Sequence, residues 1–480
     1  MKITGSISKD GLIQDIDYYS SIIEKVHGNP YRLISKEEFL ENAEKVKDQI
    51  RSVGTERFSI MDSYYYLQQI AVSLRDGHTK VSPPLSWKET VESLFPLEVV
   101  AIDHRLFVNE NLSTAVVPEC AELVSINGIS AGQMISDTLK YVEGTLLHYT
   151  MAHWSQYFPL FVQTYFKLKS PWTVTFRYDE EEKTREIPGI IVDEESEKSR
   201  LRKRYTYSES SLTVNGEKVP ILQIPHLGYG TEKVFRAFID DFFSKHKDKN
   251  YLIIDIRRCP GGQGERGFQI LDYLTDAHVL PEYRVFARFA HKVSEVYREQ
   301  VENDIRSTYI ERKIPRFLWR IPFYRVLMRG SIFANIYSRV LNAKVGEYTE
   351  TEHYHKTRTR SNRFKGKVFL LTSHATFSAG VVFAAVFKHN ETGTVVGQET
   401  GGRLGLLSDP IELELPHSKL KVLIPVAIME LPGEDLDHGL KPDLEVANTP
   451  EDHMHQIDKH LATLQEVIKT LTSTNVQLDE

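Results

Sequence analysis

The sequence predicts an α/β fold class, in which a helical region and a β-rich region precede an alternating core. From about residue 212 to residue 446, apolar runs of strand length alternate with runs of helical spacing, which is the pattern of an α/β layer structure. Residues 10–76 repeat apolar positions every three or four residues, as a helical unit does. Residues 94–190 carry short apolar runs between turn signals, which is typical of strands. For 480 residues, such a division into roughly three domains is also the expectation from length.

The boundaries of these regions follow changes in composition. Residues 191–210 are dense in charged side chains, which predicts a solvated linker. Residues 454–471 fit one amphipathic helix. We therefore expect, in chain order, an N-terminal helical domain at 1–88, a β-rich domain at 89–190, a charged linker at 191–211, an α/β core at 212–450 with a basic and aromatic insertion at about 283–350, and a C-terminal helix at 451–480.

Composition excludes several classes of function. A net charge of −7 argues against general nucleic-acid binding, and the two cysteines, Cys120 and Cys259, cannot form a disulfide framework. Two H-x-H pairs, at 353–355 and 453–455, lack an obvious third ligand, so they are expected to be ordinary polar surface and not a metal site. No run approaches the ~18 apolar residues of a membrane span, and the N-terminus has no signal-peptide core. The chain as written is expected to be cytoplasmic, or periplasmic or exported if a signal peptide had been removed.

A serine at a strand-to-helix corner is the first candidate for chemistry. Ser378 follows the apolar run 368–371 and precedes the helix-like run 381–387, with the small residues Ala379 and Gly380 beside it. At such a corner, unpaired N–H groups and the positive end of the helix dipole favour a developing oxyanion. The alternative is that Ser378 simply caps the helix, because serine is a preferred N-cap residue.

A glycine pair after a buried strand is the second candidate. The strand at 251–256 leads through Arg257 to Gly261 and Gly262, and glycines let the backbone turn its N–H groups outward, as an oxyanion hole requires. The alternative is an ordinary glycine turn. Residues 262–267 also match G-x-G-x-x-G, but a dinucleotide site is not expected, because the strand does not enter the first glycine directly and no second strand ends in an acid about twenty residues on.

Five segments together resemble the tail-specific, or C-terminal processing, serine protease family, whose relatives include the tricorn protease core. They follow the family's order along nearly the whole chain. The resemblance implies a crotonase/ClpP-like α/β catalytic core at 212–450, a PDZ-like domain at 89–190, and endopeptidase chemistry on protein or peptide substrates. The segments are Leu74-Arg75-Asp76-Gly77-His78-Thr79, residues 122–128, residues 253–262, residues 376–380 together with 396–402, and Gly439-Leu440-Lys441-Pro442-Asp443.

The resemblance also leads to the general base. One branch of the family uses a lysine, but that position resembles Arg403 here, and arginine stays protonated in proteins. The branch similar to the tricorn core uses a histidine before the PDZ-like domain, and His78 matches that position. Imidazole has a pKa suited to general-base catalysis near neutral pH. His374 is a lesser candidate, and an ordinary loop histidine is the alternative for His78.

The sequence therefore predicts a serine endopeptidase. Ser378 is the expected nucleophile and His78 the base, while the N–H of Ala379 and of Gly261 or Gly262 would hold the oxyanion. This chemistry needs no metal and no organic cofactor. Asp437 is the first choice for orienting His78, with Glu434, Asp435 and Asp76 as alternatives and a solvated acidic loop as the competing interpretation. A different class of function, a non-catalytic peptide- or lipid-binding protein on the same scaffold, remains the alternative, because fold does not determine function.

Residues 312–344 depart from the acidic average of the chain. Basic and aromatic side chains alternate there, which favours either a lid over the active site or peripheral contact with a membrane. A packed helical insertion is the alternative. The substrate sequence and the oligomeric state are left open.

Overall fold

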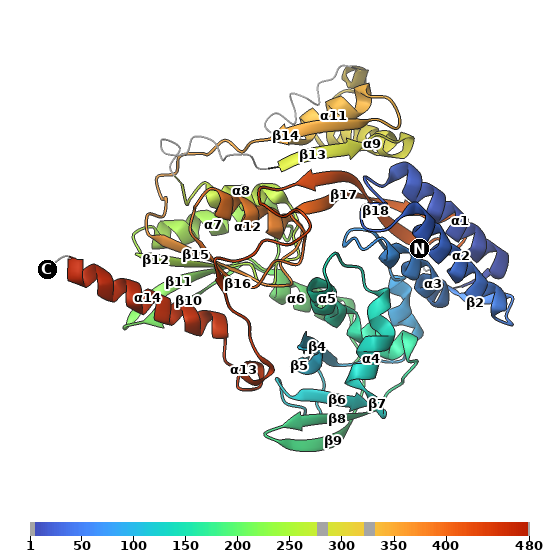
Figure 1. Cartoon of the computed structure of the whole chain (residues 1–480), viewed down its shortest axis with the longest axis horizontal. Helices are drawn as coiled ribbons and strands as arrows, with labels where there is room; N and C mark the ends of the chain where they lie inside the picture. The colour runs from blue at the N-terminus through green and yellow to red at the C-terminus, as the bar shows by residue number, and fades with distance from the viewer. Residues whose placement is uncertain (1–4, 276–286, 321–331, 479–480) are drawn as a thin grey trace. The chain divides into compact units, whose positions relative to one another are not determined.

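The computed structural model describes residues 5–275, 287–320 and 332–478 (Figure 1). The fold is mixed α/β, which confirms the predicted class. Each of its two compact units is assembled from separated stretches of chain. Unit 1 consists of Met1–Ser86, Val285–Tyr354 and Gly405–Leu431, and unit 2 of Trp87–Arg284, His355–Leu404 and Pro432–Glu480.

Unit 1 begins with three helices, where the spacing of apolar residues predicts helical structure. They are α1 (Lys9–Val26), α2 (Lys36–Ser52) and α3 (Ile60–Ser73). Each helix starts after a serine whose hydroxyl accepts a backbone N–H of the first turn, so the N-terminal ends are capped as the sequence favours. The short strands β1 (Ser6–Ser8) and β2 (Arg57–Ser59) pair antiparallel beside them.

An antiparallel sheet in the order β14-β13-β18-β17 completes unit 1, with β3 also paired to β18. The buried carboxylate of Asp15, on α1, accepts hydrogen bonds from the backbone N–H groups of His417 (2.9 Å) and Ser418 (2.7 Å), and so ties α1 to the β17–β18 hairpin. The strands are β3 (Lys80–Val81), β13 (Ala287–Lys292), β14 (Tyr348–His353), β17 (Gly405–Glu414) and β18 (Lys421–Glu430).

The segment expected as an insertion supplies two of these strands. Between β13 and β14 lie α9 (Glu295–Glu311), the 3₁₀ turn η4 (Arg316–Arg320) and α11 (Ile332–Asn342). Residues 321–331 of the basic and aromatic stretch lie outside the described residues. The Tyr337 hydroxyl donates a hydrogen bond to Asp304 (2.9 Å), which joins α11 to α9.

Unit 2 is built around a six-stranded sheet in the order β10-β11-β12-β15-β16-β19. Every neighbouring pair from β11 onward is parallel, and β10 joins the edge antiparallel. The strands are β10 (Ser208–Val214), β11 (Glu217–Gln223), β12 (Tyr251–Asp255), β15 (Lys367–Thr372), β16 (Thr394–Gly397) and β19 (Leu444–Glu445).

Both faces of this sheet are buried, as parallel sheets require. On one face Ile253, Phe369 and Val396 pack with Leu464 and Ile468 of α14 (Lys459–Leu478), which runs beside the sheet in Figure 1. The alternating strand positions that face the other side are buried as well. The remaining helices of this core are α7 (Glu232–His246), α8 (Gly264–Leu271) and α12 (Ala379–His389), and the short α13 (Pro450–Met454) precedes α14.

The β-rich region belongs to unit 2. Its sheet has the order β4-β5-β6-β8-β9, with β7 paired to β6. The segment expected as a charged linker contains a mostly exposed helix, α6 (Glu194–Tyr205). The elements are η1 (Leu85–Thr90), β4 (Leu97–Ile102), β5 (Arg105–Asn111), β6 (Glu122–Ile126), β7 (Ile129–Ser130), α4 (Ala131–Thr138), η2 (Leu139–Tyr141), α5 (Leu147–Leu160), the π-helical turn η3 (Phe161–Tyr165), β8 (Trp172–Tyr178) and β9 (Glu181–Ile187).

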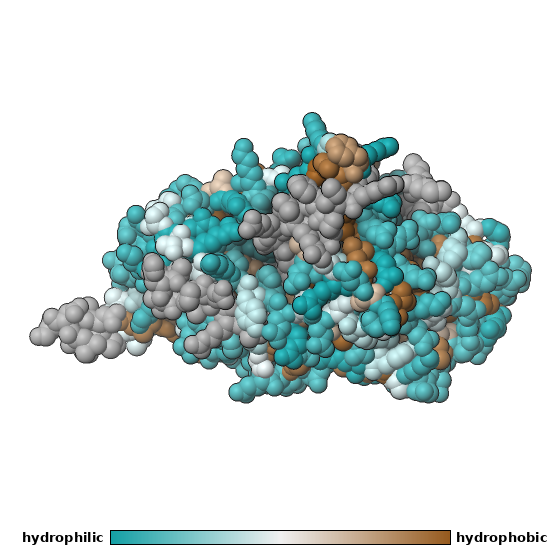
Figure 2. Space-filling model, turned by 90° about the horizontal axis from the view of Figure 1, so that it is seen from above, coloured by the Kyte–Doolittle hydropathy of each residue, from teal (hydrophilic) through white to brown (hydrophobic). Residues whose placement is uncertain are grey.

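Hydrophilic side chains predominate on the face seen in Figure 2, where apolar residues occupy small separate areas. Within the three described ranges, no helix is long and apolar enough to cross a membrane.

Candidate active site

Ser378 occupies a strained corner between β15 and α12. Its backbone has φ 51° and ψ −121°, a conformation that non-glycine residues adopt rarely and at a cost of about 1–3 kcal/mol. Although Ser378 stands at the N-cap position, its side chain makes no capping hydrogen bond to the helix. The interpretation of Ser378 as a simple helix cap is therefore wrong. A strained serine between a strand and a helix is instead the geometry of a nucleophile elbow.

Hydrogen bonds to the loop that follows β12 hold this corner in place. The hydroxyl of Ser373 donates to the carbonyl of Arg257, and the hydroxyl of Thr376 donates to the carbonyl of Ile256 (3.0 Å). The N–H of Phe377 donates to the carbonyl of Cys259 (2.9 Å). Because β12 and β15 are adjacent parallel strands, their carboxyl ends bring the two loops together. The strain at Ser378 is thus supported by the neighbouring strand.

The glycine pair 261–262 lies against the serine, and both positions require glycine. Their φ angles are +111° and +127°. A Cβ on Gly261 would stand 2.7 Å from the Cβ of Ser378 and 2.9 Å from the nitrogen of Ala379, and a Cβ on Gly262 would stand 2.3 Å from the nitrogen of Gly228. These distances are far inside van der Waals contact with backbone atoms. The interpretation of Gly261-Gly262 as an ordinary turn does not explain this close approach.

Two backbone N–H groups are available beside Ser378 for an oxyanion. The carbonyl of Gly261 accepts a hydrogen bond from the N–H of Leu227 (2.8 Å). In a trans peptide the N–H points opposite to the carbonyl, so the Gly262 N–H is directed away from Leu227. Ala379 is the first residue of α12, where an N–H has no partner within the helix. The predicted donors Ala379 and Gly262 thus lie on two loops that meet at Ser378.

A buried arginine braces the loop that supports Gly262, and the sequence reasoning missed it. Arg266 donates hydrogen bonds to the carbonyls of Tyr229 (2.6 Å) and Gly230 (2.8 Å) and to the hydroxyl of Tyr207 (2.6 Å). Its guanidinium carbon also lies 5.2 Å from the centre of the Phe235 ring. Arg266 is 1% exposed, and its buried charge is compensated by these carbonyls, by the ring and by the Glu232 carboxylate, 3.4 Å from its Nε. The sequence did carry one sign of this role, because a charged side chain within a short run of apolar helical residues indicates a buried, paired charge.

Helix α5 of the β-rich region contacts the same corner. The Tyr149 ring stacks on Phe377 with centroids 4.3 Å apart, and His148 lies 4.2 Å from His374. The His148 imidazole also lies 3.2 Å from the carbonyl oxygen of Thr400. The β-rich region therefore packs against residues on both sides of Ser378 in sequence, although more than two hundred residues separate α5 from Ser378.

His374 is placed beside another histidine rather than among acids. Burial, together with the neighbouring imidazole of His148, lowers the pKa of His374 to about 4. His374 is therefore neutral near pH 7, and its uncharged ring packs against His148 with the two ring planes tilted by 31°. Its part as a lesser candidate for the base stays a prediction.

Arg403 and Asp437 lie together in unit 2. The Arg403 guanidinium donates to the carbonyl of Thr145 (2.9 Å) and lies 3.5 Å from a carboxylate oxygen of Asp437. The Asp437 side chain is 67% exposed. Nearby, Glu399 accepts a hydrogen bond from the N–H of Gly439 (2.7 Å). An orienting role for Asp437 stays a prediction.

The predicted base, His78, belongs to unit 1, in the turn between α3 and β3. Its backbone N–H donates to a carboxylate oxygen of Asp76 (3.1 Å). Burial of the ring lowers the pKa of His78, and Lys80 acts in the same direction. The negative charges of Asp76 and Asp409 and a hydrogen bond with the backbone of Leu407 act against it without reversing the shift. His78 is therefore neutral near pH 7, as a general base must be.

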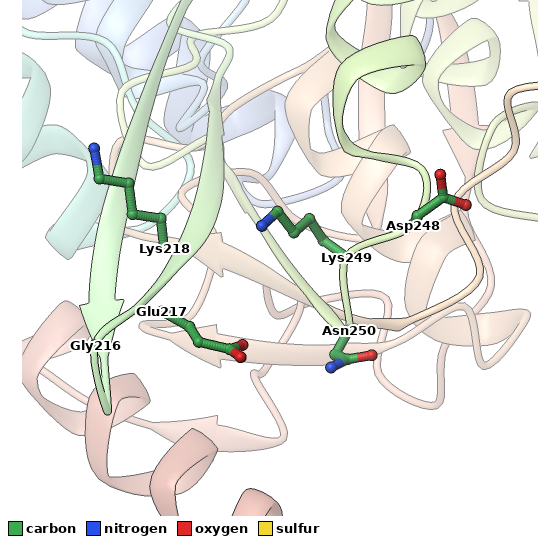
Figure 3. Close-up of a pocket in the computed structure, with 6 residues that line it drawn as sticks. All are labelled: Gly216, Glu217, Lys218, Asp248, Lys249 and Asn250. Carbon is green, nitrogen blue, oxygen red and sulfur yellow. The ribbon is translucent and has the colours of Figure 1, made fainter.

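Among the described residues, no three histidine, cysteine, aspartate or glutamate side chains lie close enough to hold a metal ion. An open pocket of about 590 Å³ is lined by Gly216, Glu217, Lys218, Asp248, Lys249 and Asn250 (Figure 3).

This pocket lies at the edge of the sheet opposite to Ser378. In Figure 3 the Glu217 carboxylate points to the side of Asn250, the Lys249 side chain extends toward β11, and Asp248 points away. Asn250 directly precedes β12, and Tyr251 pairs with Lys367 at the amino end of β15. Ser378 follows the carboxyl end of β15. The length of the parallel strands therefore separates the pocket from the candidate active site.

The chain is similar to known proteins in the sequence of its α/β core and in its fold. Residues 218–446 match the model of peptidase family S41. A search of curated proteins found no match.

Among solved structures, "mature CPAF" superposes with a TM-score of 0.66 at 14% identity, covering 98% of both chains. "Mature CPAF complexed with lactacystin" gives a TM-score of 0.67 at 14% identity, covering 97% of this chain and 98% of the other. At such low identity these matches show a shared fold. Residues 218–446, which contain Gly261, Gly262 and Ser378, therefore form a peptidase family S41 domain, and this match supports a serine-type peptidase.

Proposed function

We propose that this chain is a serine endopeptidase in which Ser378 and His78 form the nucleophile and base pair. The observation that carries the proposal is the strained Ser378, whose hydroxyl does not cap α12 and whose Cβ lies against Gly261. A serine that only capped the helix would need neither this backbone strain nor a glycine in van der Waals contact with its Cβ. A nucleophile that must stand clear of its helix and beside an oxyanion hole needs both.

In the proposed reaction, His78 takes the proton of the Ser378 hydroxyl while the oxygen attacks the peptide carbonyl carbon. The carbonyl π bond opens to an oxyanion, which the N–H groups of Ala379 and of Gly262, or of Gly261, stabilise. The protonated His78 then gives its proton to the leaving amine, and an acyl-enzyme remains on Ser378. Water, deprotonated by His78, attacks the acyl carbon, and the protonated base returns the proton to the Ser378 oxygen as the carboxylic acid leaves.

The finer architecture follows the same proposal. The parallel sheet of unit 2, with Ser378 at its carboxyl edge, would be the crotonase/ClpP-like catalytic core. The sheet β4-β5-β6-β8-β9 with α4 and α5 would be the PDZ-like domain, which captures an extended segment of a protein or peptide substrate by strand addition. Support comes from the contact of α5 with the nucleophile corner, where Tyr149 stacks on Phe377. A bound peptide there would be presented near Ser378.

Mapping a covalent probe tests the proposed function. We expect a fluorophosphonate to label the intact protein at one serine and mass spectrometry of the digested adduct to place it on Ser378, because only a hydroxyl that is activated by a base next to an oxyanion hole reacts rapidly. A protein that binds an extended peptide but is not labelled at any pH would contradict the proposal. That result would favour the alternative of a non-catalytic peptide- or lipid-binding protein.

A pair of histidine variants tests the base. We expect His78→Gln to lower kcat/KM by about 10³-fold, within the range for loss of a general base. His374→Gln serves as the matched control, because His374 precedes Ser378 in sequence but its neutral ring packs against His148. Steady-state hydrolysis of a casein-derived fluorogenic peptide measures both. A larger loss in His374→Gln than in His78→Gln would transfer the role of base to His374.

The pH dependence follows from the lowered pKa of His78. A general base acts in its neutral form, so activity is present above its pKa and is lost as pH falls through it. Because the pKa of His78 lies below its ordinary value of about 6.5, we expect the acid limb of the kcat/KM profile below that pH. A profile of the wild-type enzyme from pH 4 to pH 9 measures the limb. A midpoint above the ordinary histidine value would contradict the assignment.

A further inference from the structure

A chain of buried polar groups lies beneath the His78 turn, entirely within unit 1. Asp76 is 1% exposed, and His27 and Thr79 are fully buried. Thr79 donates its hydroxyl proton to one carboxylate oxygen of Asp76 (2.6 Å), and the N–H of His78 donates to the other (3.1 Å). A buried carboxylate is costly unless such donors satisfy it, so this arrangement needs a reason beyond packing.

The hydrogen bonds determine which atom carries each proton in this series of polar groups. The N–H of Asn29 donates to Nδ1 of His27 (3.1 Å), so that nitrogen carries no proton. The ring proton is therefore on Nε2, which lies 3.0 Å from Oγ1 of Thr79 and donates to it. Thr79 in turn donates to Asp76. The hydrogen bonds thus run in one direction, from His27 through Thr79 to Asp76. The Asp76 carboxylate, where they end, also accepts the hydrogen bond from the backbone N–H of His78.

These hydrogen bonds connect the turn that carries His78 to the end of a helix and to the sheet. His27 directly follows α1, and Asp76 and Thr79 lie between α3 and β3. Next to His27, Gly28 donates its N–H to the carbonyl of Pro425 (2.8 Å) on β18, and a Cβ on Gly28 would lie 3.1 Å from the backbone of Ala427. The turn is therefore connected through hydrogen bonds to a helix end that is itself packed against the sheet.

We propose that Asp76 is the positioning residue for His78: its buried carboxylate sets the backbone of the turn and places a negative charge beside the imidazole. This inference rests on the proposed function, in which His78 is the base. The imidazolium that forms when His78 takes the serine proton is stabilised by this charge, while the hydrogen bond to the His78 N–H limits the orientations that the ring can adopt. Asp76 acts through His78 and does not touch the substrate.

The charges around the pair agree with this role. Burial would raise the pKa of Asp76, but His27, 3.8 Å away, together with His78 and Thr79, lowers it overall, so Asp76 is ionised near pH 7. Tyr19 of α1 faces it, and burial, assisted by the Asp76 charge, raises the pKa of that phenol. The groups that face His78 are Asp76, Lys80, Asp409 of β17 and the backbone of Leu407.

The matched pair Asp76→Asn and Asp15→Asn tests the inference on the full chain. Asp15 is the control because it is also a fully buried carboxylate of unit 1 that accepts two backbone N–H groups. We expect Asp76→Asn to lower kcat by about 10- to 100-fold at nearly constant KM, within the range of general-base effects. The acid limb of kcat/KM should also move to lower pH, since the Asp76 charge raises the pKa of His78. Asp15→Asn should lower the thermal midpoint without moving the limb.

Two threonine variants keep the test decisive if Asp76→Asn fails to fold. Thr79→Val removes the hydroxyl that orients the carboxylate and should lower kcat, whereas Thr79→Ser retains the hydroxyl and should restore it. Equal kcat values and equal pH profiles in the two variants would overturn the inference, as would a folded Asp76→Asn whose kcat and acid limb match those of the wild type.

If His78→Gln itself retains full activity, the proposed base fails. If His78→Gln is inactive while Asp76→Asn behaves as wild type, only the role of Asp76 fails.

Discussion

Ser378→Ala is expected to reduce peptide hydrolysis by about 10⁴- to 10⁶-fold, the range observed when a serine nucleophile is removed from a catalytic triad. The physical reason is that no acyl-enzyme can form without the hydroxyl, while the N–H groups of Ala379 and Gly262 remain to bind a carbonyl oxygen. KM should therefore change little, and the loss should be in kcat. Initial rates on a fluorogenic peptide, with active enzyme counted by titration, measure the change.

The matched control for this variant is Ser136→Ala. Ser136 lies on α4 with an exposed hydroxyl that bonds only its own helix, at the carbonyl of Gln133 (3.0 Å). Ser136→Ala should retain full turnover, and both variants should keep the wild-type far-ultraviolet circular dichroism spectrum. A folded Ser378→Ala enzyme that retains more than about 1% of the activity would exclude Ser378 as the nucleophile, since the residual rate without it should be far lower.

Gly262→Ala is expected to lower kcat by about 10²- to 10³-fold, as loss of one oxyanion donor does. An added Cβ would stand 2.3 Å from the nitrogen of Gly228, and φ is +127°, a region in which alanine is strained. The 261–262 peptide must then rotate or shift, and its N–H leaves the position beside Ser378. A lower thermal midpoint is also expected, because the strain costs about 1–3 kcal/mol.

Gly264→Ala is the matched control two residues away. A Cβ there meets nothing within 4 Å, and Gly264 is the first residue of α8. Alanine should be tolerated or slightly stabilising in a helix, by up to about 1 kcal/mol. If Gly262→Ala and Gly264→Ala had the same kcat, the glycine pair would not contribute to the oxyanion hole.

The local part of the candidate site could be predicted from the sequence. The order of strand, serine and helix around Ser378 is confirmed, as is the buried strand that leads to Gly261. Such features depend on residues adjacent in sequence, because hydrophobic periodicity and turn residues report the conformation of the chain within about one element. The sequence could not decide whether Ser378 caps its helix, since that depends on its φ angle and hydrogen bonding.

The residues that support the site could not be predicted in this way. Arg266 is stabilised by the carbonyls of Tyr229 and Gly230, more than thirty residues earlier. His27 meets Thr79 across 52 positions of sequence. Contacts at such separations depend on how elements pack, and no periodicity in a single sequence encodes which loop meets which.

The division of the chain into two units also could not be predicted from local sequence patterns. The sequence by itself determined the α/β class, the strand–serine–helix corner at Ser378 and the glycine pair, because each follows from local pattern. The tertiary structure alone decided that the segment between β13 and β14 joins β17 and β18 in unit 1, that α5 packs on Phe377 beside Ser378, and that Asp76 is buried and bonded to the backbone of His78. These depend on strand pairing and burial between distant segments, which exist only once the chain has folded.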